Sequence, residues 1–185
     1  FQLWANLPKS HKMMSPRYRG LKSSEIPETV QSNGTRIKII CGNVDGRRGP
    51  VRDIVIDPEY LDVTVPASSE FIHPTQRGHK VFACVIEGKG YFCAERKPFS
   101  YDVEGGSYFD MRRDPYCVDH DLVLFTDGDQ VAVSTGSEQV RFLLISGKPI
   151  GEPVAWYGPI VMNTNEELRV AFEEFNNGTF VKERP

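Results

Sequence analysis

Short runs of β-branched and aromatic residues recur through the middle of the chain, separated by turn residues at intervals of about ten residues. This rhythm is typical of antiparallel sandwiches and barrels, because each run can bury one face before the chain reverses. The first run begins at Arg36, where Ile37, Ile39 and Cys41 alternate with polar neighbours. The pattern predicts an all-β antiparallel barrel, with further strands at residues 51–56, 60–65, 80–86, 90–94, 122–125, 130–134 and 141–146.

Turn residues punctuate this pattern. The Gly-rich segment 43–50 is expected to form a loop, and Gly88 and Gly90 predict a tight hairpin at residues 87–90, because glycine accepts positive φ. Another turn is expected at residues 126–129. Residues 9–31 are polar and rich in turn formers, which predicts an extended connector between two larger units.

One short helix is expected near the carboxyl end. Thr164 and Glu167 form a capping box, in which each side chain accepts a hydrogen bond from a free backbone N–H group. Gly178 is a natural end to the helix, since it can adopt the left-handed conformation. We expect the apolar stripe of this helix to contact the core, and it consists of Leu168, Ala171, Phe172 and Phe175.

The composition is that of an ordinary globular protein, with 39% hydrophobic and 25% charged residues among 185. A net charge of −3 argues against a nucleic-acid-binding surface, which concentrates Lys and Arg. No apolar run approaches the roughly 20 residues that span a bilayer, and we expect neither a membrane partner nor a signal peptide. The four cysteines form no C-x-x-C pair, and we expect them to be reduced thiols in a cytoplasmic protein. They are Cys41, Cys84, Cys93 and Cys117.

The chain opens on a strand-like apolar segment, Phe1-Gln2-Leu3-Trp4, without an initiator Met. Proteins seldom begin within a strand, so this start suggests a fragment or a processed product. An exposed apolar strand can pair with another chain. Homodimerisation, with strand exchange as one route, is therefore expected.

Three stretches resemble the pirin family. The segment that closes the first barrel of pirins is similar to Gln2-Leu3-Trp4-Ala5-Asn6-Leu7-Pro8. Their interdomain connector is similar to Lys12-Met13-Met14-Ser15-Pro16-Arg17-Tyr18, continuing to Ile26-Pro27. Their carboxy-terminal signature is similar to Gly151-Glu152-Pro153 and Tyr157-Gly158-Pro159-Ile160-Val161-Met162-Asn163-Thr164.

The resemblance implies a two-barrel cupin, of which this chain is the carboxy-terminal jelly roll with its short helix. It implies a remnant strand and connector at 1–31, the C-terminal cupin barrel at 32–162, and a helix and tail at 163–185. In pirins a metal, usually iron, is held by three His and one Glu of the first barrel, which would precede Phe1. Some relatives use that metal and oxygen to cleave flavonols such as quercetin. In eukaryotic relatives the metal-bearing half acts as a redox-linked transcription co-regulator.

The resemblance also shows where a metal site would fall in this half. The first cupin motif would place His73 at the first ligand position, Thr75 at the second and His79 near the acid, whereas the second motif, near residues 127–131, contains no His. Two imidazoles do not repay the cost of dehydrating and ordering a metal ion. We therefore predict neither a bound metal nor a catalytic residue in this chain.

A pocket or vestigial site remains a hypothesis for the same region. Its candidate residues are His73, Gln76, His79, Cys117 and His120, the last two of which could reach the barrel mouth from a long insertion at 94–121. The alternative is that His73 and His79 are solvated, because the residues around them are loop formers.

The insertion at 94–121 is longer than expected for pirins. Interleaved Arg and Tyr can stack on planar ligands, but they also suit packing over the barrel or an interface, which we favour. The residues concerned are Phe99, Tyr101, Tyr108, Phe109, Arg112, Arg113 and Tyr116.

Three functions follow from these observations. The leading hypothesis is a non-catalytic cupin domain that packs against a missing metal-binding N-terminal cupin. The second is a dioxygenase-like barrel with iron at His73, His79 and loop ligands. The third is small-molecule binding inside the barrel.

Overall fold

The computed structural model describes residues 1–96, 102 and 115–182. The chain divides into two compact units, Leu21–Lys148 and a smaller unit made of Phe1–Gly20 with Pro149–Pro185. The smaller unit therefore combines the two ends of the chain. The ranges 1–31, 32–162 and 163–185 expected from the sequence remain a prediction about folding domains.

The regular secondary structure described in the larger unit consists of a 3-10 helix at Ser23–Glu25 and the strands that follow it. Within the described residues these strands are β1 (Glu28–Val30), β2 (Arg36–Cys41), β3 (Asn43–Val44), β4 (Arg47–Arg48), β5 (Glu59–Val65), β6 (Glu70–Pro74), β7 (Lys80–Gly90), β8 (Cys117–Val118), β9 (Leu122–Leu124), β10 (Gln130–Ser134) and β11 (Val140–Gly147).

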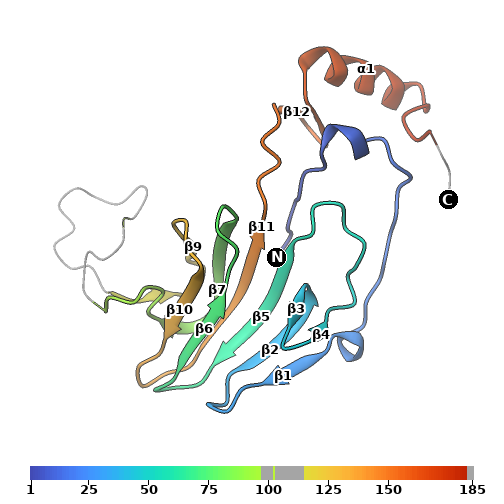
Figure 1. Cartoon of the computed structure of the whole chain (residues 1–185). Coiled ribbons are helices and arrows are strands. Elements are labelled where there is room, and N and C mark those ends of the chain that lie inside the picture. The colour runs from blue at the N-terminus through green and yellow to red at the C-terminus, as the bar shows by residue number, and fades with distance from the viewer. Residues whose placement is uncertain (97–101, 103–114, 183–185) are drawn as a thin grey trace. The chain divides into compact units, whose positions relative to one another are not determined.

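The strands β1, β2, β5, β11 and β7 lie side by side in that order in one antiparallel sheet (Figure 1). The outer edge of β7 pairs with β9 near its start and with β8 at its end. β6 pairs with β10, and β3 with β4 in a short hairpin. These antiparallel sheets share one core, as in a cupin-type jelly roll. The predicted all-β class is confirmed.

The core lies between the inward faces of the two main sheets. Phe142 of β11 is fully buried, and its ring packs edge-on against Phe71 of β6 and Phe92, at centroid distances of 6.0 and 5.1 Å. Strand alternation supplies the aliphatic remainder of the cluster, which includes Ile37, Ile39, Leu61, Val63, Val65, Val81, Ala83, Val85, Val131, Val133 and Leu144.

Strand β7 changes its inward face part-way along its length. Phe142 lies opposite Val85, but the register then shifts and leaves Ile86 as the extra residue of a β-bulge. Val85 is buried, Ile86 is exposed, and Gly88 then lies opposite the buried end of β11. A Cβ atom on Gly88 would lie 2.1 Å from the carbonyl oxygen of Gln139, and φ is +78°, so glycine is required here.

Three local predictions are wrong. The predicted hairpin at 87–90 lies inside β7, because its glycines accommodate the bulge rather than a turn. The predicted strand at 51–56 is a loop in which only Val51 makes an isolated bridge, since Asp53 at φ +57° turns the chain. The predicted strand at 90–94 leaves the sheet after Gly90, and Tyr91 makes only an isolated bridge to Ser134.

Several short strands are absent from the sequence-based prediction. β6 occupies a segment expected to be loop, β1 lies in the expected connector at 9–31, and the β3–β4 hairpin lies in the expected loop at 43–50. Each is two to five residues long, which is too short for alternation to show in the sequence.

The smaller unit contains a 3-10 helix at Lys9–His11, a hairpin of β12 (Ala155–Tyr157) and β13 (Ile160–Met162), and helix α1 (Asn165–Asn176). The predicted capping box is confirmed, because the Thr164 hydroxyl accepts from the N–H of Glu167 at 3.2 Å and the Glu167 carboxylate accepts from the N–H of Thr164 at 3.1 Å. Gly178, at φ +72°, follows the helix as predicted. Among the described residues, no helix has the length and apolarity to cross a membrane.

The apolar stripe of α1 is only partly buried. Ala171 is buried and packs with Leu168 and Phe172 against β13. Phe175 is 55% exposed, and its ring contacts that of Phe180 at 6.3 Å between centroids. The predicted core contact is therefore confirmed for the first three positions of the stripe and not for Phe175.

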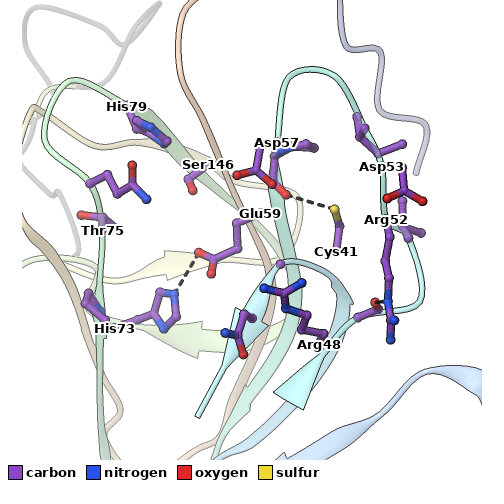
Figure 2. A pocket seen from close by; sticks show the side chains of 18 residues that line it. Cys41, Arg48, Arg52, Asp53, Asp57, Glu59, His73, Thr75, His79 and Ser146 are labelled. Carbon is purple, nitrogen blue, oxygen red and sulfur yellow. Dashed lines mark hydrogen bonds and ion pairs between the residues drawn. The ribbon is translucent and has the colours of Figure 1, made fainter. Parts of the chain in front are cut away.

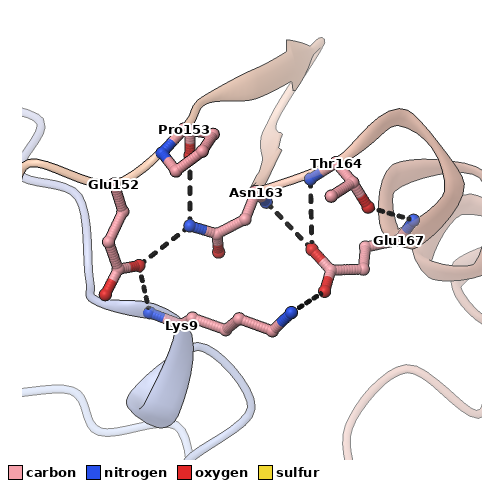
Figure 3. A network of polar contacts seen from close by, with 6 residues as sticks. All are labelled: Lys9, Glu152, Pro153, Asn163, Thr164 and Glu167. Atoms are coloured by element: carbon pink, nitrogen blue, oxygen red, sulfur yellow. Dashed lines mark hydrogen bonds and ion pairs between the residues drawn. The ribbon is translucent and has the colours of Figure 1, made fainter.

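A polar network joins the two segments of the smaller unit (Figure 3). Glu152 accepts from the Lys9 backbone N–H and from the Asn163 amide, both at 2.8 Å. The Lys9 ammonium pairs with Glu167 at 2.6 Å, and this contact lowers the pKa of Glu167 below its ordinary value. The amino-terminal segment is thus tied to the start of α1 by charged hydrogen bonds.

Most of the 94–121 insertion lies outside the described residues, including Phe99, Tyr101, Tyr108, Phe109, Arg112 and Arg113. In the described part, the ring of Tyr116 packs on that of Tyr91 at 4.6 Å between centroids, and the Lys89 Nζ lies 5.5 Å from the centroid of the Tyr116 ring. The role of the insertion remains a prediction.

Adjacent residues of β6 provide a test of the core. Phe71→Ala should lower the free energy of unfolding by about 3–5 kcal/mol, because the fully buried ring leaves a cavity. Ile72→Ala should change it by less than about 0.5 kcal/mol, because Ile72 is half exposed on the opposite face. Denaturant unfolding measures both, and equal losses would contradict the placement of β6.

Candidate functional site

A polar cavity of about 690 Å³ opens at one end of the barrel (Figure 2). Its walls come from the ends of β2, β6 and β11, from the β3–β4 hairpin, from the start of β5, and from the loops before β5 and β7. The lining residues with polar or charged side chains are Cys41, Asn43, Arg48, Arg52, Asp53, Asp57, Glu59, His73, Thr75, Gln76, His79 and Ser146.

The base of this cavity carries a buried histidine. His73 is only 5% exposed, because it follows Phe71 on the inward face of β6 and lies opposite Val131 of β10. Its ring stacks on that of Phe71, with the planes 11° apart. The His73 Nε2 atom lies 2.9 Å from the Glu59 Oε2 atom, so an ionised Glu59 accepts the Nε2 hydrogen.

Glu59 is held at the first position of β5. It lies opposite Ser146 of β11 and shares the inward side with Leu61. Gly42 permits its approach, because a Cβ atom there would lie 3.0 Å from the Glu59 Cγ atom and φ of Gly42 is +106°. Pairing with β11 and the close contact with Gly42 thus position Glu59, and its carboxylate bonds to His73.

The loop between β4 and β5 is tied back to β2. Gly49 packs so closely on β2 that a Cβ atom would lie 2.6 Å from the Ile40 carbonyl oxygen. The Cys41 thiol donates to the Pro58 carbonyl at 3.0 Å, and the Arg52 Nε atom donates to the Gly49 carbonyl at 3.1 Å. These contacts give the loop a fixed course along the cavity.

Cys41 is held in its neutral form by its surroundings. Burial raises the pKa of its thiol, and the nearby carboxylate of Asp57 raises it further. A thiol is much less nucleophilic than a thiolate. Cys41 is therefore a structural hydrogen-bond donor at neutral pH.

The structure places the five candidate residues in different surroundings. His73, Gln76 and His79 line the cavity. Cys117 is buried in the core cluster on β8, and His120 is exposed in a turn at φ +72°, so neither lines this cavity. The expectation that His73 is a solvated loop residue is wrong, because β6 carries it inward.

Sequence reasoning missed Glu59, Arg48 and Asp57. Glu59 could have been found, because it lies two residues before Leu61 and thus on the buried side of the predicted strand. Arg48 and Asp57 gave no such signal, since Arg48 lies in the segment expected to be loop and Asp57 lies between two predicted strands.

The cavity residues do not fit a cupin metal centre. Within the described residues, no group of three or more His, Cys, Asp and Glu side chains is arranged to hold an ion. The two buried donors, His73 and Glu59, are instead hydrogen-bonded to each other. A transition-metal site needs several converging donors, so this pair alone does not make one.

A family model described as the pirin C-terminal cupin domain matches residues 60–181 of the chain. The chain belongs to the pirin family. It is 34% identical to a pirin-like protein of Caulobacter vibrioides over 97% of its own length and 58% of that protein. It is 35% identical to Pirin-1 of Arabidopsis thaliana over 95% of its own length and 56% of that protein.

Solved structures share the pirin fold. A quercetin 2,3-dioxygenase structure from Acinetobacter baumannii superimposes with a TM-score of 0.75 at 23% identity, covering 96% of this chain and 55% of that one. Across eight curated relatives, the chain spans 51% to 65% of their length.

The thiol of Cys41 provides a pH test of the site. In a variant whose other cysteines are Ser, the alkylation rate by iodoacetamide should rise with pH to a midpoint above that of free cysteine, because burial and Asp57 disfavour the thiolate. Asp57→Asn should lower this midpoint, whereas Asp45→Asn, which is also at positive φ but outside the cavity, should not. A midpoint at or below that of free cysteine would contradict this account.

Proposed function

We propose that this chain is the C-terminal cupin half of a two-barrel pirin, where it serves as the non-catalytic partner of a metal-bearing N-terminal cupin. The observation that carries the proposal is the donor arrangement in its own barrel. A cupin oxidase needs a metal held by several converging side chains, and here His73 is hydrogen-bonded to Glu59 without a third donor among the described residues.

An uncovered apolar surface on the larger unit supports the partner role. Leu122 and Leu124 of β9 are 59% and 66% exposed, on the opposite face from the core-packed Val123. They pair with β7, whose outward residues include Phe82 and the exposed Ile86. We call Phe82, Ile86, Leu122 and Leu124 the outer patch. Exposed apolar patches of this kind mark interaction surfaces.

A second apolar surface lies on the smaller unit. A groove of about 680 Å³ is lined by the amino-terminal segment and the β12–β13 hairpin. Trp4 and Trp156 in this aromatic groove are 62% and 68% exposed, and Val154 is 65% exposed. Tryptophan is among the residues most enriched in protein interfaces. The N-terminal cupin is the occupant proposed for both surfaces, because the relatives are longer than this chain by about the length of such a domain.

In this proposal the chemistry belongs to the partner barrel. Iron held by three His and one Glu there would supply oxygen activation. Cleavage of a flavonol, the activity named for the Acinetobacter baumannii structure, is the reaction class proposed for the whole protein. The alternative, a dioxygenase-like site with iron at His73 and His79 of this chain, requires a third ligand from the 94–121 insertion.

Metal analysis separates these alternatives. The chain purified without a His tag and then incubated with Fe²⁺ should retain less than about 0.1 equivalent of iron, nickel, copper or zinc, because too few donors converge in its cavity. Mass spectrometry of the elements measures this content. Stoichiometric iron that is lost in His73→Ala would support the enzymatic alternative and contradict the proposal.

The outer patch should bind hydrophobic probes in the isolated chain. The fluorescence of anilinonaphthalene sulfonate should increase on mixing, and Leu122→Glu with Leu124→Glu should reduce the increase, because both side chains are exposed and apolar. Val30→Glu, at another exposed apolar position, is the matched control.

The same proteins test association with the partner. Light scattering of the chain co-expressed with the N-terminal cupin of its parent should give a 1:1 complex that the double Glu variant weakens. A homodimer of the chain alone, lost in the same variant, would place a second copy on the patch instead. Unchanged probe binding and unchanged association would contradict a role for this surface.

A further inference from the structure

The polar cavity presents two charged side chains that form no hydrogen bond or ion pair with another described residue. Within the described residues, the Arg48 guanidinium and the Asp57 carboxylate make no hydrogen bond or ion pair, although both line the cavity. The other cavity charges are engaged, since Glu59 binds His73 and Arg52 donates to Gly49. In the view of Figure 2, Asp57 lies above Glu59 and Arg48 lies below it.

The backbone positions of Arg48 and Asp57 are well defined. Arg48 lies on β4, directly before Gly49, whose contact with β2 leaves no room for a side chain. Asp57 has φ of +43°, and its N–H donates to the Ile54 carbonyl at 3.0 Å in a turn. A non-glycine residue in this region stores strain, and such strain concentrates at ligand sites. The backbone positions from which the two opposite charges extend are thus fixed, and both side chains are exposed at the cavity.

We propose that this cavity binds a small zwitterion, a free α-amino acid, with its carboxylate at Arg48 and its ammonium group at Asp57. The proposal does not depend on the partner role of the chain. A simple anion at Arg48 would be repelled by the nearby acidic groups Asp57 and Glu59, and a simple cation at Asp57 would be repelled by Arg48. A zwitterion satisfies both charges at once, and arginine suits a planar carboxylate because it can donate two parallel hydrogen bonds.

The remaining lining determines the ligand's side chain. Thr75, Gln76, His79 and Ser146 offer hydrogen-bonding groups, and the exposed aromatic rings that would stack on a planar ligand are absent from the described lining. The volume of about 690 Å³ lies in the range of small-molecule sites. A polar amino acid therefore fits this cavity better than an apolar one.

The experiment is a titration of the full chain with each of the twenty free L-amino acids, followed by thermal shift and by amide NMR. A polar member should bind saturably and raise the unfolding midpoint, since it binds only the folded state. Arg48→Ala and Asp57→Asn should each weaken its binding by at least about tenfold. Arg47→Ala and Asp45→Asn, which change the same charges outside the cavity, should leave binding unchanged.

Derivatives of the amino acid that binds most tightly test the two contacts separately. Its carboxamide lacks the charged group that contacts Arg48, so it should bind the unchanged chain weakly, but no more weakly than the free amino acid binds Arg48→Ala. Its N-acetyl form lacks the ammonium charge, so it should bind the unchanged chain no more weakly than the free amino acid binds Asp57→Asn. Amide NMR spectra confirm that each variant is folded. The proposal would be overturned if no amino acid bound saturably up to about 10 mM, or if the derivatives bound as tightly as the free amino acid.

Discussion

The packing of three phenylalanine rings determines how the two sheets of the barrel face each other. Phe142 lies at the centre, between Phe71 on the opposite sheet and Phe92 beyond the end of β7. Because interiors are close-packed, the position of these rings fixes the position of whatever follows them on the same face. His73 is the next inward residue after Phe71, and its ring stacks on it. The polar end of the barrel is therefore a direct extension of its apolar core.

The sequence was informative where a strand is long and alternates regularly. Ile37 to Cys41, Leu61 to Val65 and the capped helix after Thr164 were placed correctly, because period and capping are local signals. It failed where tertiary pairing decides the structure. β6 is short and ends at Pro74, and it becomes a strand only because β10 supplies its hydrogen bonds. The misread segment at 51–56 has β-branched residues, but left-handed aspartates turn it away from the sheet.

Only part of the candidate site could be predicted from the sequence, because strand pairing brings its other residues together. His73, Gln76 and His79 were named from a family pattern, and the structure places all three on one cavity. Glu59, the partner of His73, lies fourteen positions earlier and on another strand, so no spacing rule joins them. Their hydrogen bond directs the imidazole to a carboxylate rather than to a metal ion. The cavity thus contains the residues that the resemblance assigned to a cupin centre, but no group of three or more metal-binding side chains among the described residues.

The bulge in β7 has a consequence for comparing pirin sequences. Before Ile86 the odd-numbered residues of this strand face the interior, and after it the even-numbered residues do. A homologue lacking the extra residue would keep the same pairs, because Val85, Glu87 and Gly88 would still lie opposite Phe142, Arg141 and Val140 in a regular strand. Gly88 would still face the space beside Gln139. A one-residue gap at Ile86 would therefore remove only the bulge, whereas a gap elsewhere in β7 would turn the rest of the strand inside out.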